Sequence, residues 1–152
     1  MAGGQDGPLS YLDDSHIAAE AKHFAAYGFG GKDAYAADIS EQTLFDVYLR
    51  PWHAAARAGL RGLMAAHNEV NGVPMHMNTR LLTDVMRGQF GFGGLVASDA
   101  SDIGVLPNFR VTANKTTAAI AAVQAGLDQD LCQVSAHMCY CLKLLSTTSF
   151  TR

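Results

Sequence analysis

Ionisable residues stand at the ends of three short apolar runs in this sequence. Lys22 and His23 end the first run, His67 follows the second, and Asp99 follows the third. A lysine and an imidazole can donate hydrogen bonds to a polar ligand. A carboxylate can serve as a nucleophile. If the three runs are parallel strands, their ends meet at one face, and these side chains would surround one ligand there.

An aspartate after a strand is by itself a weak signal. Taken alone, Asp99 is more often a helix cap or a loop residue. Lys22 alone could be a surface lysine whose stem lies along apolar neighbours. His67 alone could be a hydrogen-bonded residue at a strand end. Only the combination of all these positions predicts a site.

The elements that must position these residues alternate along the chain. Apolar runs and helical spacings predict a βαβαβαβ order. The expected strands are residues 17–24, 62–66, 95–98 and 127–131, and the expected helices are residues 40–58, 79–89 and 116–125. This alternation predicts a parallel sheet with right-handed crossovers. An open doubly wound sheet and part of a (β/α)8 barrel both fit it.

Several residues predict where the helices begin and end. Asp38 and Glu41 have the spacing of a capping box for the first helix. Pro51 predicts a kink within that helix, and Gly59 is expected at its C-terminal end. Asn78 is expected to cap the second helix.

Two glycine-rich segments are candidates for phosphate-binding loops. Residues 28–33 follow a strand, but they fit neither dinucleotide nor Walker A spacing, because Asp33 and Lys32 stand at the wrong positions. Residues 91–94 precede a strand instead of following one. We therefore interpret both as loops, and the ionisable strand ends favour part of a barrel over an open sheet.

An ordered series of segments resembles family 3 glycoside hydrolases. The resemblance extends over residues 16–131, with the segments in family order. The matching segments are Ala-Lys-His-Phe at 21–24, Ile-Ser-Glu at 39–41, Leu-Arg-Pro-Trp at 49–52, the segments 64–74 and 78–94, Val-Ala-Ser-Asp at 96–99, and Ala-Gly-Leu-Asp at 125–128.

The resemblance implies a retaining, exo-acting β-glycosidase of the β-glucosidase or β-xylosidase type. Such enzymes use one carboxylate as nucleophile and a second carboxyl group as acid and base. Asp99 takes the position of the nucleophile. Lys22 and His23 take positions that hydrogen-bond the hydroxyls of the sugar, and His67 is a further substrate-binding position. No cofactor and no metal ion are implied.

Two residues depart from the pattern of the better-known branches. Position 67 is His where they have Tyr, which changes the reach of the hydrogen bond. Ala100 follows Asp99 where an aromatic residue is common, so one wall of the sugar site is expected to be thinner. Glu69 is interpreted as a solvated loop residue and not as the acid. Sugar identity therefore stays open between glucoside and xyloside.

The composition excludes some partner classes. The chain has 152 residues and a net charge of −3, which gives no sign of a nucleic-acid or membrane partner. No apolar stretch approaches a membrane span, and the N-terminus does not have the features of a secretory signal. Cys132, Cys139 and Cys141 match no metal or disulfide spacing and are expected to be ordinary thiols.

The expected organisation has three parts. Residues 1–15 form an N-terminal extension, residues 16–131 form part of the barrel, and residues 132–152 form a divergent tail. Because a full (β/α)8 barrel needs about 250 residues, the chain is expected to supply roughly the second half. The other half of the barrel and the domain with the acid/base are expected to be needed for activity. The alternative is an inactive product that binds sugar weakly or pairs with another chain.

Overall fold

The chain forms a mixed α/β structure around a parallel sheet. The computed structural model describes residues 17–30 and 35–131. The main sheet contains β1 (Glu20–Phe24), β3 (Gly62–Ala65) and β6 (Leu95–Ala97), in the order β1-β3-β6, with both pairs parallel. The first three predicted strands are thus present and pair as expected. The predicted extension, the tail and its cysteines lie outside the described residues.

The first predicted helix is divided near its proline. It comprises α1 (Glu41–Thr43), η1 (Leu44–Tyr48) and α2 (Arg50–Arg57). In η1 the backbone bonds span five residues, and Pro51 occupies the first turn of α2, where its missing N–H costs little. The N-terminal cap is Ser40, whose hydroxyl accepts from the N–H of Thr43, so the prediction of a capping box from Asp38 was wrong.

The remaining helices follow the later strands. They are η2 (Met75–Met77) and η3 (Arg80–Gln89) before β6, and α3 (Asp102–Val105) and α4 (Lys115–Gln124) after it. The Asn78 side chain accepts from the N–H of Leu81, as expected for a cap of η3. Asn114 and Thr117 form a reciprocal capping box at α4. The short helix α3 was not predicted.

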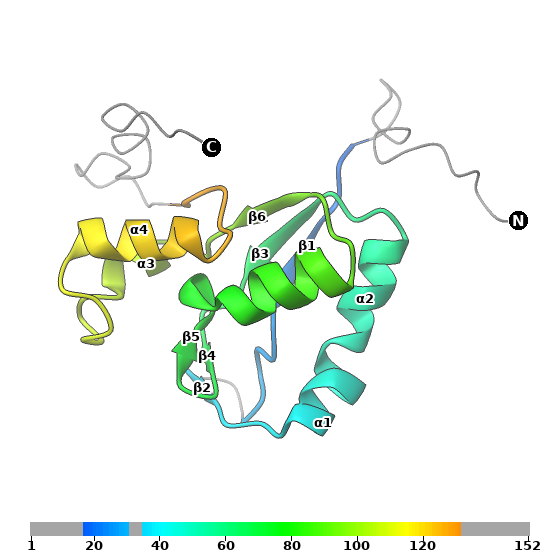
Figure 1. The fold of residues 1–152 in the computed structure, drawn as a ribbon, viewed down its shortest axis with the longest axis horizontal. Coiled ribbons are helices and arrows are strands. Elements are labelled where there is room, and N and C mark those ends of the chain that lie inside the picture. The colour runs from blue at the N-terminus through cyan, green and yellow to red at the C-terminus, as the bar shows by residue number, and fades with distance from the viewer. Residues whose placement is uncertain (1–16, 31–34, 132–152) are drawn as a thin grey trace, which may run out of the picture.

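The core lies where the helices cover the sheet. In Figure 1 the green helix η3 crosses one face of the sheet, with α2 beside β1 and α4 beyond β6. The strands contribute fully buried Leu63 and Val96 to the core cluster. The helix contributes a buried stripe at helical spacing, namely Leu81, Leu82, Val85 and Met86. This packing fixes the direction in which the strand ends point.

A second small sheet holds the loops above the strand ends. It contains β2 (Ala36–Ala37), β4 (Glu69–Val70) and β5 (Val73–Pro74), in that order, and it was not predicted. Asn71 closes this arrangement. Its side chain accepts from the N–H of Ile39 at 2.7 Å and donates to the carbonyl of Ile39 at 2.9 Å. The loops after β1 and β3 are therefore joined to each other.

The fourth predicted strand, residues 127–131, is only partly formed. It makes one isolated parallel bridge, between Ala97 and Gln129. Backbone hydrogen bonds from the N–H groups of Asp128 and Gln129 to the carbonyl of Val96 hold the segment, and side chains add to them. Asp128 accepts from the N–H of Val96 at 2.9 Å and pairs with Arg87 of η3 at 2.6 Å. The segment thus lies beside β6 without forming a regular strand.

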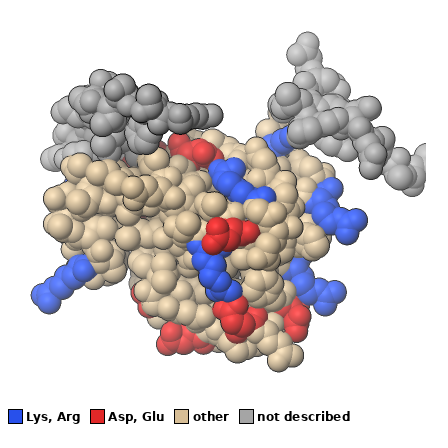
Figure 2. Space-filling view, in the orientation of Figure 1, with Lys and Arg blue, Asp and Glu red and all other residues tan. Residues whose placement is uncertain are grey.

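The surface charges are mixed. Figure 2 shows acidic and basic side chains interspersed on one face of the molecule. Two ion pairs are Arg87–Asp128 and Arg80–Glu41, both on or beside η3. Across residues 17–30 and 35–131, no helix has the length and apolar character that crossing a bilayer requires.

Candidate functional site

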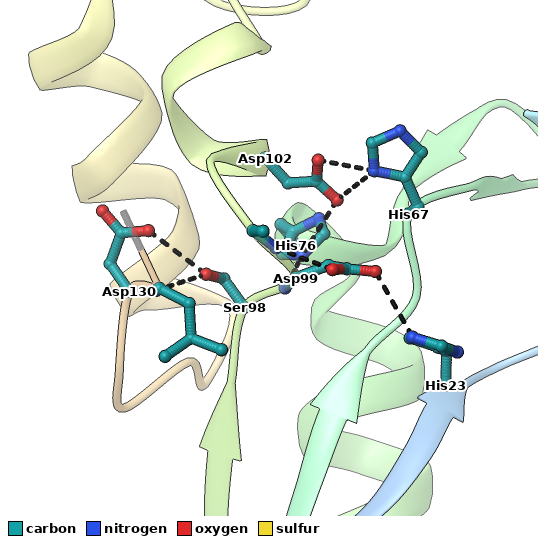
Figure 3. Close-up of polar contacts among 9 residues, drawn as sticks. His23, His67, His76, Ser98, Asp99, Asp102 and Asp130 are labelled. Carbon is teal, nitrogen blue, oxygen red and sulfur yellow. Dashed lines mark hydrogen bonds and ion pairs between the residues drawn. The ribbon is translucent and has the colours of Figure 1, made fainter. Parts of the chain in front are cut away.

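The strand ends bring the predicted residues to one edge of the sheet. His23 lies near the end of β1, His67 comes two residues after β3, and Asp99 comes two residues after β6. Figure 3 shows these three side chains gathered above the ends of the strands. The parallel pairing of β1, β3 and β6 explains the convergence, because parallel strands end on the same side.

The Asp99 carboxylate is held in place but partly open. The N–H of Ala100 donates to its Oδ1 at 2.7 Å, and Nε2 of His23 lies 3.6 Å from its Oδ2. The side chain is 23% exposed. The carboxylate is thus fixed by its neighbours and still reachable from outside the molecule.

His76 fixes the backbone under Asp99. It is buried, and its Nε2 accepts a hydrogen bond of 3.0 Å from the N–H of Asp99. That bond requires a neutral ring with its proton on Nδ1. Burial lowers the pKa of His76 to about 4, which keeps the ring neutral. His76 therefore supports the backbone at Asp99 through this hydrogen bond.

A second carboxylate, Asp102, joins the site and was missed in the sequence. Nδ1 of His67 lies 2.6 Å from its Oδ2 and 2.5 Å from its Oδ1. The backbone turns between the two aspartates at Ser101, whose φ of 65° is the left-handed conformation. This turn directs Asp99 and Asp102 to the same side. Only the repeated Ser-Asp at 98–99 and 101–102 could have drawn attention to it.

The electrostatics of the two carboxylates differ. Burial raises the pKa of Asp102 to about 6, with the nearby Asp99 adding to the effect and the bond from His67 opposing it. Burial also lowers the pKa of His23, which the charge of Asp99 opposes and Lys22 and His67 reinforce. The site therefore contains groups whose proton affinity is shifted from ordinary values, as functional sites commonly do.

Two hollows adjoin these residues. The first, of about 320 Å³, is called the His67 hollow here and is lined by Tyr35, His67, Glu69, Asp102, Leu106 and Phe109 among others. The second, of about 600 Å³, is called the Lys22 hollow and is lined by Lys22, His23, Tyr27 and Trp52 among others. Lys22 thus lies in a hollow beside His23, and among the described residues no hydrogen bond or ion pair joins it to Asp99.

The strand end behind Asp99 is stabilised by a further hydrogen-bond network. The buried hydroxyl of Ser98 donates to Asp130 at 3.1 Å and accepts from the N–H of Leu131 at 2.8 Å. Burial raises the pKa of Asp130, and the bond from Ser98 partly opposes that shift. Asp130 therefore anchors the chain beside β6 and does not face the other site residues in Figure 3.

The same cluster contains ligand types suited to a cation. His67, Asp99 and Asp102 each offer one ligand atom, and these atoms lie within 4.8 Å of one another. Imidazole and carboxylate are common zinc ligands. The short contact between His67 and Asp102 is, however, a hydrogen-bond distance, so the cluster is satisfied internally as it stands.

Comparison with known proteins identifies relatives of this chain among glycosidases. A β-xylosidase of Formosa agariphila is 44% identical over 124 residues, which cover 79% of this chain and 17% of that protein. A periplasmic β-glucosidase of Salmonella typhimurium is 37% identical over 80% of this chain and 16% of its own length. The chain spans about a sixth of the length of these curated relatives.

Solved structures show the same likeness. A β-glucosidase from Listeria innocua matches with a TM-score of 0.79 and 33% identity over 93% of this chain and 20% of its own. A β-glucosidase from Erythrobacter marinus matches with a TM-score of 0.75 and 39% identity over 81% of this chain and 17% of its own. The sequence model of the Glycosyl hydrolase family 3 N terminal domain matches residues 6–150. The chain therefore belongs to glycosyl hydrolase family 3.

Proposed function

We propose that this chain is part of a retaining exo-β-glycosidase that hydrolyses O-glycosyl bonds, with Asp99 as its nucleophile. The observation that carries the proposal is the placement of a fixed, partly exposed carboxylate beside His23 and His67 at the ends of three parallel strands. A retaining hydrolase needs a nucleophilic carboxylate close to a second carboxyl group that exchanges protons with the leaving oxygen. Asp99 is the carboxylate that we propose for the first role.

The fold proposal is that the described residues form part of a (β/α)8 barrel, roughly its second half. Support comes from the parallel strands, the helices between them and the ionisable residues at the strand ends. In this arrangement residues 16–131 are barrel, residues 1–15 an extension and residues 132–152 a tail. A β-linked glucoside or xyloside would lie across the strand ends, with His23, Lys22 and His67 contacting its hydroxyls.

The substrate class follows from the relatives. Those named above are described as a β-xylosidase and as β-glucosidases, and the Listeria innocua enzyme has been solved with glucose and, as a mutant, with laminaribiose. We extend the same classes, β-glucosides and β-xylosides, to this chain. No cofactor is part of the proposed reaction.

The test compares two matched carboxylate-to-amide changes. If the purified chain hydrolyses a nitrophenyl β-glucoside or β-xyloside, Asp99→Asn should lower that rate by at least about a thousandfold. Asp84→Asn, at an exposed position of η3, should leave the rate unchanged. A fluorinated glycoside that traps the sugar ester should label Asp99, which peptide mass spectrometry would locate. Full activity of Asp99→Asn would rule out the assignment.

A second candidate is a chain that binds sugar weakly without turnover, or that pairs with another chain supplying the other barrel half and an acid/base domain. It is favoured by the sixth of the relatives' length that the chain spans. Failure of the purified chain to act on either glycoside, with activity restored when the missing parts are added, would support it. Turnover by the chain alone, abolished by Asp99→Asn, would exclude it.

A further inference from the structure

Asn71 and Gly72 form the two-residue turn between β4 and β5. Both have positive φ, 51° for Asn71 and 81° for Gly72, which is the combination that a type I′ hairpin turn requires. Both residues are exposed. Of the asparagines in the sequence, Asn71 alone is followed by glycine. Because glycine has no Cβ, nothing on the next residue hinders its backbone nitrogen from closing a ring onto the Asn71 side chain.

The Asn71 side chain is held at both of its polar atoms. Its Oδ1 accepts from the N–H of Ile39 at 2.7 Å, and its Nδ2 donates to the carbonyl of Ile39 at 2.9 Å. The backbone N–H of Asn71 also donates to the carbonyl of Ala37 at 3.1 Å. A side chain bound in this way cannot turn its Cγ onto the backbone nitrogen of Gly72 until the bonds to Ile39 break.

We propose that Asn71 is a site of spontaneous deamidation, that the fold protects it, and that its conversion loosens the contact between the loops after β1 and β3. This modification does not depend on the proposed glycosidase function. The backbone nitrogen of Gly72 bonds to Cγ of Asn71, the bond from Cγ to Nδ2 breaks, and ammonia leaves with the proton of the Gly72 N–H. Water then opens the cyclic imide at either carbonyl, which gives aspartate or isoaspartate.

Either product removes the donor that the carbonyl of Ile39 requires. An ionised carboxylate accepts hydrogen bonds but donates none, so an oxygen faces that carbonyl in place of the Nδ2 group. Ile39 is 5% exposed and belongs to the core cluster, where an acceptor without a partner is costly. Isoaspartate also adds a carbon atom to the backbone of a two-residue turn, which disturbs the register of β4 and β5.

The loosened segment carries part of the wall of the His67 hollow. Figure 1 shows β2 next to β4 and β5, and β2 pairs with β4 at two positions. The Tyr35 carbonyl, just before β2, accepts from the N–H of Glu69 at 2.7 Å. The Tyr35 ring lies 4.9 Å from that of His67 and lines the same hollow. Deamidation of Asn71 therefore alters the hollow through Tyr35.

Protection of Asn71 depends on how often the small sheet opens. In the folded chain the rate of deamidation equals the rate in the open chain multiplied by the fraction of time that the turn is open. Since two hydrogen bonds to Ile39 must break together, we expect that fraction to lower the rate by about ten- to hundredfold.

The first experiment incubates the purified chain in mildly alkaline buffer, with and without a denaturing concentration of urea. Peptide mass spectrometry follows the replacement of the amide by a carboxyl group, and an isoaspartyl methyltransferase labels the isoaspartate. We expect Asn71 to convert about ten- to hundredfold more slowly in the native buffer than in urea. Asn108 is exposed and precedes Phe109, so it is the internal control and should convert far more slowly than Asn71 in urea.

Two matched substitutions test whether opening of the small sheet controls the native rate. Val70 and Val73 flank the turn and pair with each other, but Val70 is 3% exposed whereas Val73 is 41% exposed. Val70→Ala removes buried contacts and should raise the native rate at Asn71 several-fold. Val73→Ala should leave that rate nearly unchanged. In urea both variants should react at the wild-type rate, because the reacting residues are the same.

Asn71→Asp supplies one product directly. Hydrogen exchange should show faster exchange of the amides of Glu69 and of position 71 in this variant, with Leu63 in β3 unchanged. If this variant fails to fold, the deamidated fraction of an aged native sample, separated by ion exchange, is compared in its place.

Three results would overturn the assignment of Asn71. The first is equal conversion of Asn71 in native buffer and in urea, and the second is conversion of Asn108 as fast as that of Asn71 in urea. The third is an equal response to Val70→Ala and Val73→Ala. Unchanged exchange at Glu69 in the deamidated chain would overturn the loosening of the two loops. None of these results bears on the labelling of Asp99 by a fluorinated glycoside, which tests the proposed function separately.

Discussion

At the scale of residues, burial divides the imidazoles and carboxylates of the site into different roles. His76 is buried and neutral, and it supports the backbone of Asp99. Asp102 is buried too, but the contact with His67 offsets part of the cost of burying its carboxylate. Asp99 stays partly exposed. Residues of the same type thus differ because their surroundings favour different protonation states.

These shifts predict how stability depends on pH. The pKa of His76 is about 4 in the folded chain and about 6.5 unfolded, so the unfolded state binds more protons between these values. Stability therefore falls as the pH drops through this window, by roughly 3 kcal/mol from His76. Asp102 acts in the opposite direction. Its folded pKa of about 6 lies above its unfolded value of 3.8, so stability rises as the pH falls through that window.

Asp102→Asn removes one of these two opposing effects. We expect the free energy of unfolding of this variant to fall more steeply between pH 6.5 and pH 4 than that of the wild type, because the loss from His76 is then unopposed. Urea unfolding at several pH values measures the difference. Asp84→Asn is the control for the change of charge. Parallel curves for Asp102→Asn and the wild type would contradict the assigned shifts.

At the scale of elements, β6 is held by close backbone approach as well as by pairing. Leu95 donates to the carbonyl of Arg61 at 2.9 Å, just before β3 begins. A methyl group added at Gly94 would overlap that carbonyl, whereas at Gly93 it would meet nothing within 4 Å. The Arg87 guanidinium donates to the carbonyl of Gly94 at 3.1 Å. The start of β6 therefore requires glycine at one of two adjacent positions.

Two neighbouring substitutions test this requirement. We expect Gly94→Ala to lower the free energy of unfolding by about 1–3 kcal/mol, the usual cost of overpacking against a rigid neighbour. Gly93→Ala should have little effect, since the space beside it is open. Chemical denaturation of both variants provides the comparison. Equal destabilisation by the two changes would show that the requirement lies elsewhere.

At the scale of the whole molecule, the two sheets differ in the length of their strands and in how far the core covers them. β3 is the central strand of the main sheet and pairs on both sides. The sheet of β2, β4 and β5 consists of strands of two residues each. Few residues hold the small sheet together, whereas β3 is covered by the core. Local opening should therefore begin in the small sheet.

Hydrogen exchange would reveal this order. We expect the amides of Leu63 and Met64 in β3 to exchange slowest, near the rate set by global unfolding, and those of Ala37 and Val70 to exchange faster. Mass spectrometry or NMR of the exchanging chain measures both. If the two sheets exchanged at one common rate, they would open as a single cooperative unit.

The sequence predicted what periodicity and strand-end residues can show. It located the three paired strands and placed His23, His67 and Asp99 at or just after their ends, because apolar runs followed by ionisable groups are local patterns. Lys22 lines a separate hollow beside His23. The sequence missed the small sheet, whose two-residue strands have no periodicity. It also missed Asp102, which depends on the left-handed turn at Ser101 and on contact with a residue 35 positions away.

The two hydrogen bonds between the Asn71 side chain and the backbone of Ile39 make this site a practical starting point for redesign. The Asn71 side chain binds both the backbone N–H and the backbone carbonyl of Ile39. The segment that carries Tyr35 is therefore anchored at Ile39 without using the side chains of Tyr35 and Ala36. The Tyr35 ring lies 4.9 Å from that of His67, at the edge of the His67 hollow. Libraries at Tyr35 and Ala36 can therefore vary the ligand preference of the hollow while the scaffold beneath stays unchanged.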